Sequence, residues 1–210
     1  MIFEYKFFEF PDHEFISFEM PQSLEEICRW DFIIPVFNAQ NEQKYDLCDD
    51  YIINILYGLR IFLNNVLAQQ LQLHKSLQKD IGYMWNEYLQ KRGRFIYEVN
   101  EYGRSWIGKR YMFCESSQDC KTDCATWLYQ KGEQFYLEIT PEYRWHFIDP
   151  KPEEASKYVT YDTFIQTYKP YVLKEITLST IHQLLKKTEE VIEAVKKHDS
   201  KYFSPDLILP

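Results

Sequence analysis

Residues 46–67, DLCDDYIINILYGLRIFLNNVL, are the stretch that decides the fold. Apolar side chains recur here every three or four residues, which is the spacing of one face of an α-helix. Asp46 is the expected N-cap, with Asp49 and Asp50 in the first turn, where the helix dipole favours acids. Two further isoleucines add apolar bulk on other faces, so this helix is predicted to lie in the middle of the fold. The stripe consists of Cys48, Ile52, Ile55, Leu56, Leu59, Phe62, Leu63, Val66 and Leu67.

The segments on either side of this helix have the pattern of β-strands. Residues 2–20 alternate aromatic and charged side chains around a Pro-Asp turn, which predicts a hairpin. Residues 94–140 form a hairpin-rich middle part. Its clearest unit, residues 125–140, has two apolar strands around a turn in which Gly132 is expected to need a positive φ. Residues 106–114 are also predicted to be extended.

Two shorter elements are expected near the N-terminus. Ser23 is followed three residues later by Glu26, which is the spacing of a capping box and predicts a short helix over residues 24–30. Residues 33–37 are predicted to form a strand. Because Pro35 lacks a backbone N–H, that strand is expected at the edge of its sheet.

The C-terminal part, residues 160–199, is predicted to be helical. Thr160 is the expected N-cap of a short helix, and a second apolar stripe begins at Ile181. Because strands and helices are segregated along the chain, the predicted class is α+β. We expect an antiparallel sheet built from hairpins, packed against the long central helix and the C-terminal helix. No stretch has the composition of a linker, so residues 1–210 are expected to form a single domain.

The composition is that of a folded protein that does not enter a membrane. Hydrophobic residues make up 45% and charged residues 27%, which excludes an intrinsically disordered chain. No apolar run reaches the roughly 20 residues that a membrane span needs, and the N-terminus does not resemble a signal peptide. Five cysteines, an odd number, do not suggest a disulfide framework. We therefore expect a cytoplasmic protein.

The charge of the chain is unevenly distributed. Residues 1–60, the acidic N-terminal third, carry twelve acidic and four basic side chains, and this excess equals the whole net charge of −8. If these acids share a surface, they repel nucleic acid and attract a basic protein partner. Alternatively, they are solvated and serve solubility alone. The residues predicted to contact a partner are Glu25, Glu26, Asp46, Asp49 and Asp50.

Signatures of catalysis are missing from the sequence. It has neither G-x-x-x-x-G-K-[ST] nor G-x-G-x-x-G, and no G-x-S-x-G. Cys114, Cys120 and Cys124 are spaced too loosely for a typical zinc site, even with His146 as a fourth ligand. We predict no catalytic residue, no cofactor and no metal. The alternative is a hydrolase or thiol-dependent enzyme in which one of these cysteines pairs with His146.

One region resembles a known family. Residues 126–147 contain Thr-Trp-Leu-Tyr, a turn, and Phe-Tyr-Leu-Glu-Ile-Thr-Pro-Glu-Tyr-Arg-Trp-His-Phe. Together with Trp106-Ile-Gly-Lys109 and Tyr161-x-x-Phe164, they resemble bacterial immunity proteins of polymorphic toxin systems, of the contact-dependent growth inhibition type. The resemblance covers roughly residues 105–195 and implies a small, non-catalytic cytoplasmic protein. Such a protein binds and neutralises one cognate toxin domain, commonly a nuclease, and the resemblance assigns it no catalytic residues.

Overall fold

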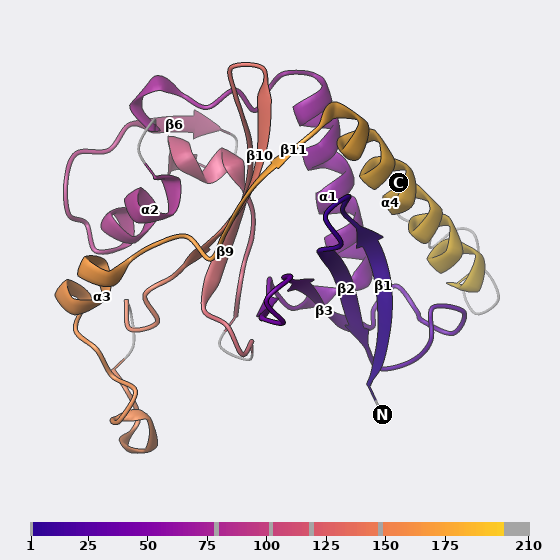
Figure 1. The fold of residues 1–210 in the computed structure, drawn as a ribbon, viewed down its shortest axis with the longest axis horizontal. Coiled ribbons are helices and arrows are strands. Elements are labelled where there is room, and N and C mark those ends of the chain that lie inside the picture. The colour runs from indigo at the N-terminus through magenta and orange to yellow at the C-terminus, as the bar shows by residue number, and fades with distance from the viewer. Residues whose placement is uncertain (1, 78–79, 101–102, 118–119, 147–148, 200–210) are drawn as a thin grey trace.

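The computed structural model describes residues 2–77, 80–100, 103–117, 120–146 and 149–199 (Figure 1). The predicted α+β class is confirmed: antiparallel sheets are combined with a central helix and a long C-terminal helix. The strands are β1 (Phe3–Glu9), β2 (Phe15–Met20), β3 (Phe32–Asn38), β4 (Lys44–Asp46), β5 (Asp50–Tyr51), β6 (Tyr97–Asn100), β7 (Gly103–Trp106), β8 (Met112–Glu115), β9 (Cys124–Lys131), β10 (Gln134–Pro141) and β11 (Val172–Ile176). The α-helices are α1 (Ile52–Leu67), α2 (Ile81–Leu89), α3 (Tyr161–Thr167) and α4 (Leu178–Asp199).

The N-terminal sheet has the strand order β1-β2-β3-β4, and β5 also pairs with β3. The predicted hairpin over residues 2–20 is confirmed by the antiparallel pairing of β1 with β2. The expectation that Pro35 marks an edge strand is wrong, because β3 has partners on both sides. Pro35 lies between the short ladders made by β5 and β4, where no partner requires its missing N–H. Its carbonyl accepts a hydrogen bond from Leu47 N at 2.8 Å.

The second large sheet has the order β11-β10-β9-β8. Its predicted central hairpin, β9–β10, is confirmed, and Gly132 in the turn has a φ of 64°. The extended segment expected over residues 106–114 is wrong in its middle, where residues 107–111 form a 3-10 helix. This turn folds tightly onto the preceding tryptophan, since a Cβ on Gly108 would lie 2.3 Å from the Trp106 ring. Strand β11 was not predicted.

The central helix begins later than the sequence indicates. Asp46 is not its N-cap but ends β4, and Asp50 belongs to β5, so α1 begins at Ile52. Strand pairing with β3 therefore takes precedence over the first two turns of the expected helix. The helix expected over residues 24–30 is also wrong. That segment is a loop with a turn in which Glu26 N donates to Ser23 O at 3.1 Å.

Helix α1 lies between the two large sheets and packs along α4 (Figure 1). Its predicted stripe faces the interior, and one contiguous cluster of buried apolar side chains joins both sheets to both helices. The N-cap expected at Thr160 is confirmed, because its hydroxyl accepts from Thr163 N. None of the helices in the described part of the chain is long and apolar enough to cross a membrane.

Leu59 tests this arrangement. It is 8% exposed and lines an apolar cavity of about 40 Å³ enclosed by both sheets, α1 and α4. Truncation to alanine enlarges a space that the surrounding strands cannot collapse to fill, so Leu59→Ala should lower the free energy of unfolding by roughly 2–5 kcal/mol. Urea denaturation measures this loss. Ile61→Ala, on the same helix but 56% exposed, is the control and should change stability by less than about 1 kcal/mol. Equal stability of parent and Leu59→Ala would contradict the placement of the core.

Candidate protein-binding surface

The structure separates the five acids that were predicted to contact a partner. Glu25 and Glu26 are exposed, and Asp49 and Asp50 are half-buried. The prediction for Asp46 is wrong, because its side chain is buried, with 3% of the residue exposed. The Asp46 carboxylate accepts a hydrogen bond from Lys121 N at 2.9 Å and so holds the loop before β9. Four of the five acids can therefore reach a partner.

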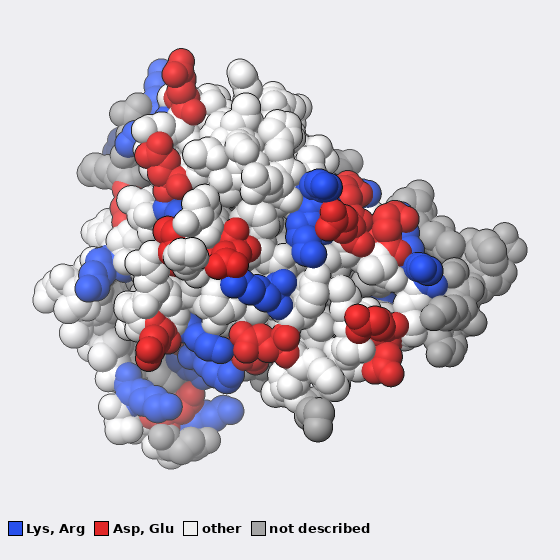
Figure 2. Space-filling view, turned by 45° about the vertical axis from the view of Figure 1, so that its right-hand side comes forward, with Lys and Arg blue, Asp and Glu red and all other residues white. Residues whose placement is uncertain are grey.

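The other acids of the N-terminal third are partly neutralised by lysines. Figure 2 shows acidic and basic side chains interspersed over one face of the molecule rather than gathered in a single acidic area. The acidic excess of the sequence therefore does not form one continuous acidic area on this face. Ion pairs join Glu4 to Lys44, Glu9 to Lys6, Glu19 to Lys121, and both Asp12 and Glu14 to Lys174.

Three aromatic rings lie in contact at the surface where the loop of residues 21–31 enters β3. Trp30 is 49% exposed and Phe32 is 54% exposed. Tyr51 contacts both: its ring centroid lies 5.5 Å from that of Trp30 and 4.4 Å from that of Phe32. Single exposed apolar side chains are common on folded proteins. Contact between three rings makes a continuous area of the kind that partners cover.

Backbone pairing fixes these rings in place. Phe32 is the direct neighbour of Tyr51 in the β3–β5 ladder, so their side chains emerge on the same face. The first free N–H groups of α1 are also used: Ile52 N donates to Asp31 O at 3.0 Å, and Ile53 N donates to Arg29 O at 3.4 Å. The loop therefore completes the N-terminus of the helix, which is otherwise short of acceptors.

The predicted acids lie next to these rings along the chain. Asp50 precedes Tyr51 in β5, and its carboxylate accepts from Tyr51 N at 2.7 Å and from Asn54 Nδ2 at 3.0 Å. Asp49 comes directly before it, and Glu25 and Glu26 belong to the same loop as Trp30. We name this set the aromatic–acidic surface: Trp30, Phe32, Tyr51, Glu25, Glu26, Asp49 and Asp50. Sequence reasoning found its acids but missed its rings, although Trp30 and Phe32, two residues apart, have the spacing of one strand face.

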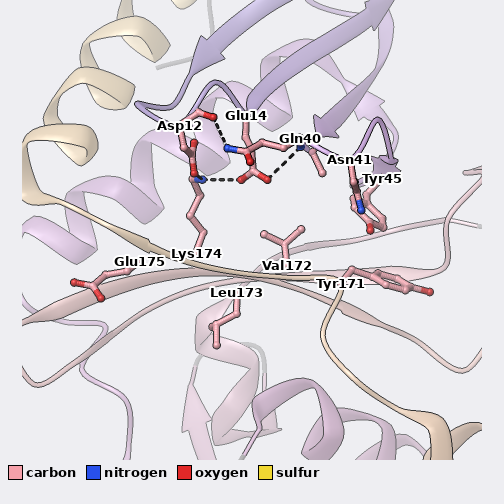
Figure 3. Close-up of a pocket in the computed structure, with 11 residues that line it drawn as sticks. Asp12, Glu14, Gln40, Asn41, Tyr45, Tyr171, Val172, Leu173, Lys174 and Glu175 are labelled. Carbon is pink, nitrogen blue, oxygen red and sulfur yellow. Dashed lines mark hydrogen bonds and ion pairs between the residues drawn. The ribbon is translucent and has the colours of Figure 1, made fainter.

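A polar groove of about 470 Å³ lies between β11 and the turns of the N-terminal sheet (Figure 3). Lys174 projects into it from β11, and its ammonium group donates to Asp12 and, at 2.6 Å, to Glu14. Although burial opposes the effect, the hydrogen bond and charge of Lys174 lower the pKa of Asp12. Tyr45 and Tyr171 stack at 5.0 Å across the same junction.

The chemistry of this groove is structural. Its lysine is 9% exposed and already bound to two carboxylates, so it is neither a free nucleophile nor a free anion-binding group. Burial raises the pKa of Tyr171 to about 12, which keeps its hydroxyl protonated. The hydrogen bond from Lys174 to Glu14 joins the two sheets between residues 160 positions apart in sequence. No local sequence motif predicts this contact.

The cysteines of the enzyme alternative do not meet His146 in the described structure. Cys124 Sγ donates to Asp46 O at 3.2 Å, and Cys114 Sγ donates to Leu47 O at 3.5 Å. Burial raises the pKa of both thiols, which disfavours the reactive thiolate. His146 is hydrogen-bonded instead to Asn86 at 3.1 Å and Gln90 at 2.8 Å, and burial lowers its pKa to about 4.

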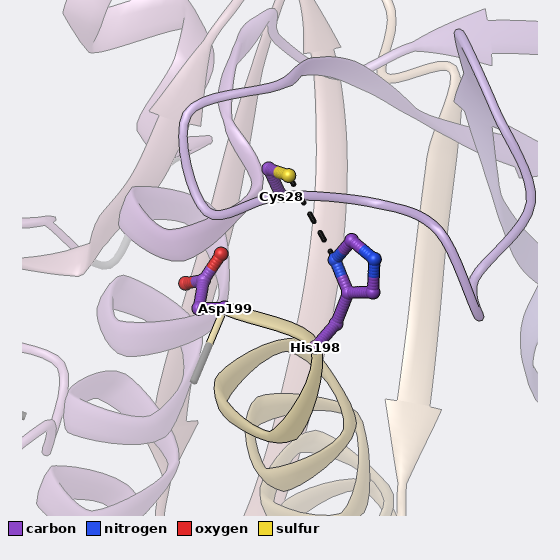
Figure 4. A group of neighbouring side chains, drawn as sticks. All are labelled: Cys28, His198 and Asp199. Carbon is purple, nitrogen blue, oxygen red and sulfur yellow. Dashed lines mark hydrogen bonds between the residues drawn. The ribbon is translucent and has the colours of Figure 1, made fainter. Parts of the chain in front are cut away.

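A different cysteine does lie beside a histidine (Figure 4). Cys28 Sγ is 3.7 Å from His198 Nδ1, and the Asp199 carboxylate lies next to them. Arg29 Nε donates to Asp199 Oδ2 at 2.5 Å. Burial raises the pKa of the Cys28 thiol, and the negative charges of Asp31 and Asp199 add to this effect. The thiol is therefore poorly suited to act as a nucleophile.

Comparisons with protein-family models, with curated proteins and with solved structures found no match to this chain. The resemblance to immunity proteins stays a prediction.

Glu138 is a buried carboxyl group in the middle of β10. It is 3% exposed and accepts a hydrogen bond from the Tyr129 hydroxyl at 2.7 Å. Burial raises its pKa from 4.5 to about 7, and the tyrosine bond only partly offsets this. The group therefore keeps its proton in the folded protein at pH values where the unfolded chain has lost it.

This difference predicts a pH-dependent stability. Between pH 4.5 and about 7 the folded state binds one more proton at Glu138, so the free energy of unfolding falls as the pH rises. Glu138→Gln removes this dependence, and its stability relative to the parent should rise by up to about 3 kcal/mol over that range. Urea denaturation at a series of pH values measures the difference, with the exposed Glu133→Gln as control. A constant difference between Glu138→Gln and the parent would show that the carboxyl group titrates normally.

Proposed function

We propose that this chain is a non-catalytic inhibitor that binds and neutralises a basic protein domain, most simply a cognate toxin domain such as a nuclease. The observation that carries the proposal is the aromatic–acidic surface. Tryptophan and tyrosine are enriched among the residues that dominate binding energy at interfaces. The neighbouring carboxylates complement a basic partner and exclude an acidic one.

The resemblance to immunity proteins suggests which class of partner to expect, namely a toxin domain that is commonly a nuclease. Nuclease domains bind a polyanion and therefore carry basic clefts, which the carboxylates of Glu25, Glu26, Asp49 and Asp50 would complement in charge. The proposal includes a cytoplasmic location, which the five free cysteines support because a reducing compartment keeps thiols free. It includes no membrane contact and no direct contact with nucleic acid.

The thiol-dependent enzyme is the weaker alternative. Two of its candidate cysteines, Cys114 and Cys124, are hydrogen-bonded to backbone carbonyls, and its candidate histidine is bound to two side-chain amides. The polar groove has its lysine neutralised by two carboxylates. The described residues therefore favour binding over catalysis.

Trp30 tests the apolar centre of the surface. The partner is the protein encoded beside this chain, produced as a catalytically inactive variant so that both can be purified. Because truncation of a central interface tryptophan typically costs about 2 kcal/mol or more, Trp30→Ala should weaken binding roughly 30-fold, and Phe32→Ala should act in the same direction. Calorimetric titration measures the affinity.

Matched controls are available on distant strands. Val99 is 81% exposed and Leu173 is 60% exposed, so Val99→Ala and Leu173→Ala remove apolar area outside the surface and should leave affinity unchanged. If the inactive neighbouring protein does not bind this chain and its active form does not arrest growth, the proposed function is wrong. Tight binding that is insensitive to Trp30 and Phe32 would keep the function and overturn the surface.

Glu25 and Glu26 test the charged rim. Their double change to glutamine should slow association at low ionic strength and reduce its dependence on salt, because exposed charges act mainly by steering. The melting temperature should stay nearly the same, since both residues are exposed. Stopped-flow association kinetics measure the rates for the double variant and for each single variant, with the exposed Glu133→Gln as a charge-matched control for the single variants. An equal effect of Glu133→Gln would show that net charge, and not this rim, governs association.

A further inference from the structure

The Cys28–His198–Asp199 group combines three residue types that hold transition metals. Thiolate, imidazole and carboxylate are all ligands of zinc. Each residue offers one ligand atom, and these atoms all lie within 4.8 Å of one another. Among the described residues, no other group of three or more His, Cys, Asp or Glu side chains brings its ligand atoms this close together.

We propose that Cys28, His198 and Asp199 bind a divalent transition-metal ion, with zinc as the best match. In a tetrahedral zinc site the ligand bonds are about 2.0–2.3 Å long, which places neighbouring ligand atoms about 3.5 Å apart. The observed separation of Cys28 Sγ from His198 Nδ1 is 3.7 Å. This pair is therefore already near the spacing of a zinc site, and Asp199, whose ligand atom lies within 4.8 Å of both, would move closer on binding. Cys28 is half-buried, so water can occupy the fourth position.

The charges around the group balance those of the ion. Asp199 and the Cys28 thiolate each contribute one negative charge, and Asp31 contributes a third through its hydrogen bond to Cys28 N at 2.7 Å. Arg29 contributes one positive charge. With a divalent cation these groups sum to zero, whereas without it the thiolate would face two carboxylates. Binding therefore replaces the thiol proton: Cys28–SH and M²⁺ give Cys28–S–M⁺ and H⁺.

The surrounding hydrogen bonds hold the ligands in position. Arg29 Nε engages Asp199 Oδ2 at 2.5 Å, while Oδ1 accepts only a longer bond, 3.3 Å, from Arg29 N and is the better placed oxygen for the metal. Gln22 Nε2 donates to Asp31 at 2.6 Å and so fixes the carboxylate that holds the Cys28 backbone. Supporting bonds of this kind orient metal ligands in proteins.

The site would join the loop of residues 21–31 to the end of α4. The three ligands come from segments 170 residues apart, so the metal would cross-link the start and the end of the described chain. This inference does not depend on the proposed function, because metal binding can be measured without any partner.

Cobalt(II) is the probe, because a thiolate bound to it gives an intense near-ultraviolet charge-transfer band. Titration of the full chain, purified with chelator and reductant, should reach saturation at one equivalent, and zinc should abolish the band by displacement. Zinc should also raise the melting temperature of the parent, since a ligand that binds only the folded state stabilises it.

Variants identify the ligands. Cys28→Ser and His198→Gln should lose the band and the zinc-induced rise in melting temperature. Cys114→Ser and His182→Gln, which change a half-buried cysteine elsewhere and an exposed histidine of α4, should keep both. Asp199→Asn should weaken cobalt binding by about tenfold or more. If removal of Asp199 unfolds the chain, the Cys28 and His198 variants still decide the question. Absence of the band in the folded parent, or its persistence in Cys28→Ser, would overturn the site.

Discussion

Burial of helix α1 between two antiparallel sheets is the constraint on which the rest of the molecule depends. Six of its side chains are buried, and they contact both sheets and α4. Neither sheet could cover its apolar face alone, because each has few strands and one face that needs a partner. The helix supplies that partner for both. The position of α1 then determines where its N-terminus lies, and hence where the loop of residues 21–31 must run.

Elements with a strong local pattern could be predicted from the sequence. The β9–β10 hairpin combines two apolar strands with a glycine that needs a positive φ, and the apolar stripe of α4 is regular over its length. The strands at residues 46 and 50–51 could not be predicted, because acids at these positions suit the start of a helix as well as they suit a short strand. Only pairing with β3, a tertiary contact, decides the outcome. The prediction from Pro35 was wrong for the same reason. The local sequence does not show that β4 and β5 pair with separate parts of β3 and leave a gap at this proline.

The same distinction applies to the candidate site. A count of charges found four acids of the aromatic–acidic surface, but it could not show that Asp46 is buried under the loop before β9. The Lys174 junction and the Cys28–His198 contact join residues at least 160 positions apart. Pairs this far apart form no sequence motif with a characteristic spacing, so they can be found only once the fold is known. The cysteines that are close in sequence turned out to serve packing, whereas an isolated cysteine lies beside a histidine.

Arg29 connects the aromatic–acidic surface to the Cys28–His198–Asp199 group. Its carbonyl accepts from Ile53 at the start of α1, and its guanidinium holds Asp199 at the end of α4. Cys28 precedes it and Trp30 follows it, so the backbone on both sides is fixed by the same contacts. A surface held this rigidly would lose little conformational freedom if a partner bound it, and less of the interaction energy would be spent on ordering it. The buried arginine therefore gives the exposed tryptophan the fixed position that a central interface residue needs.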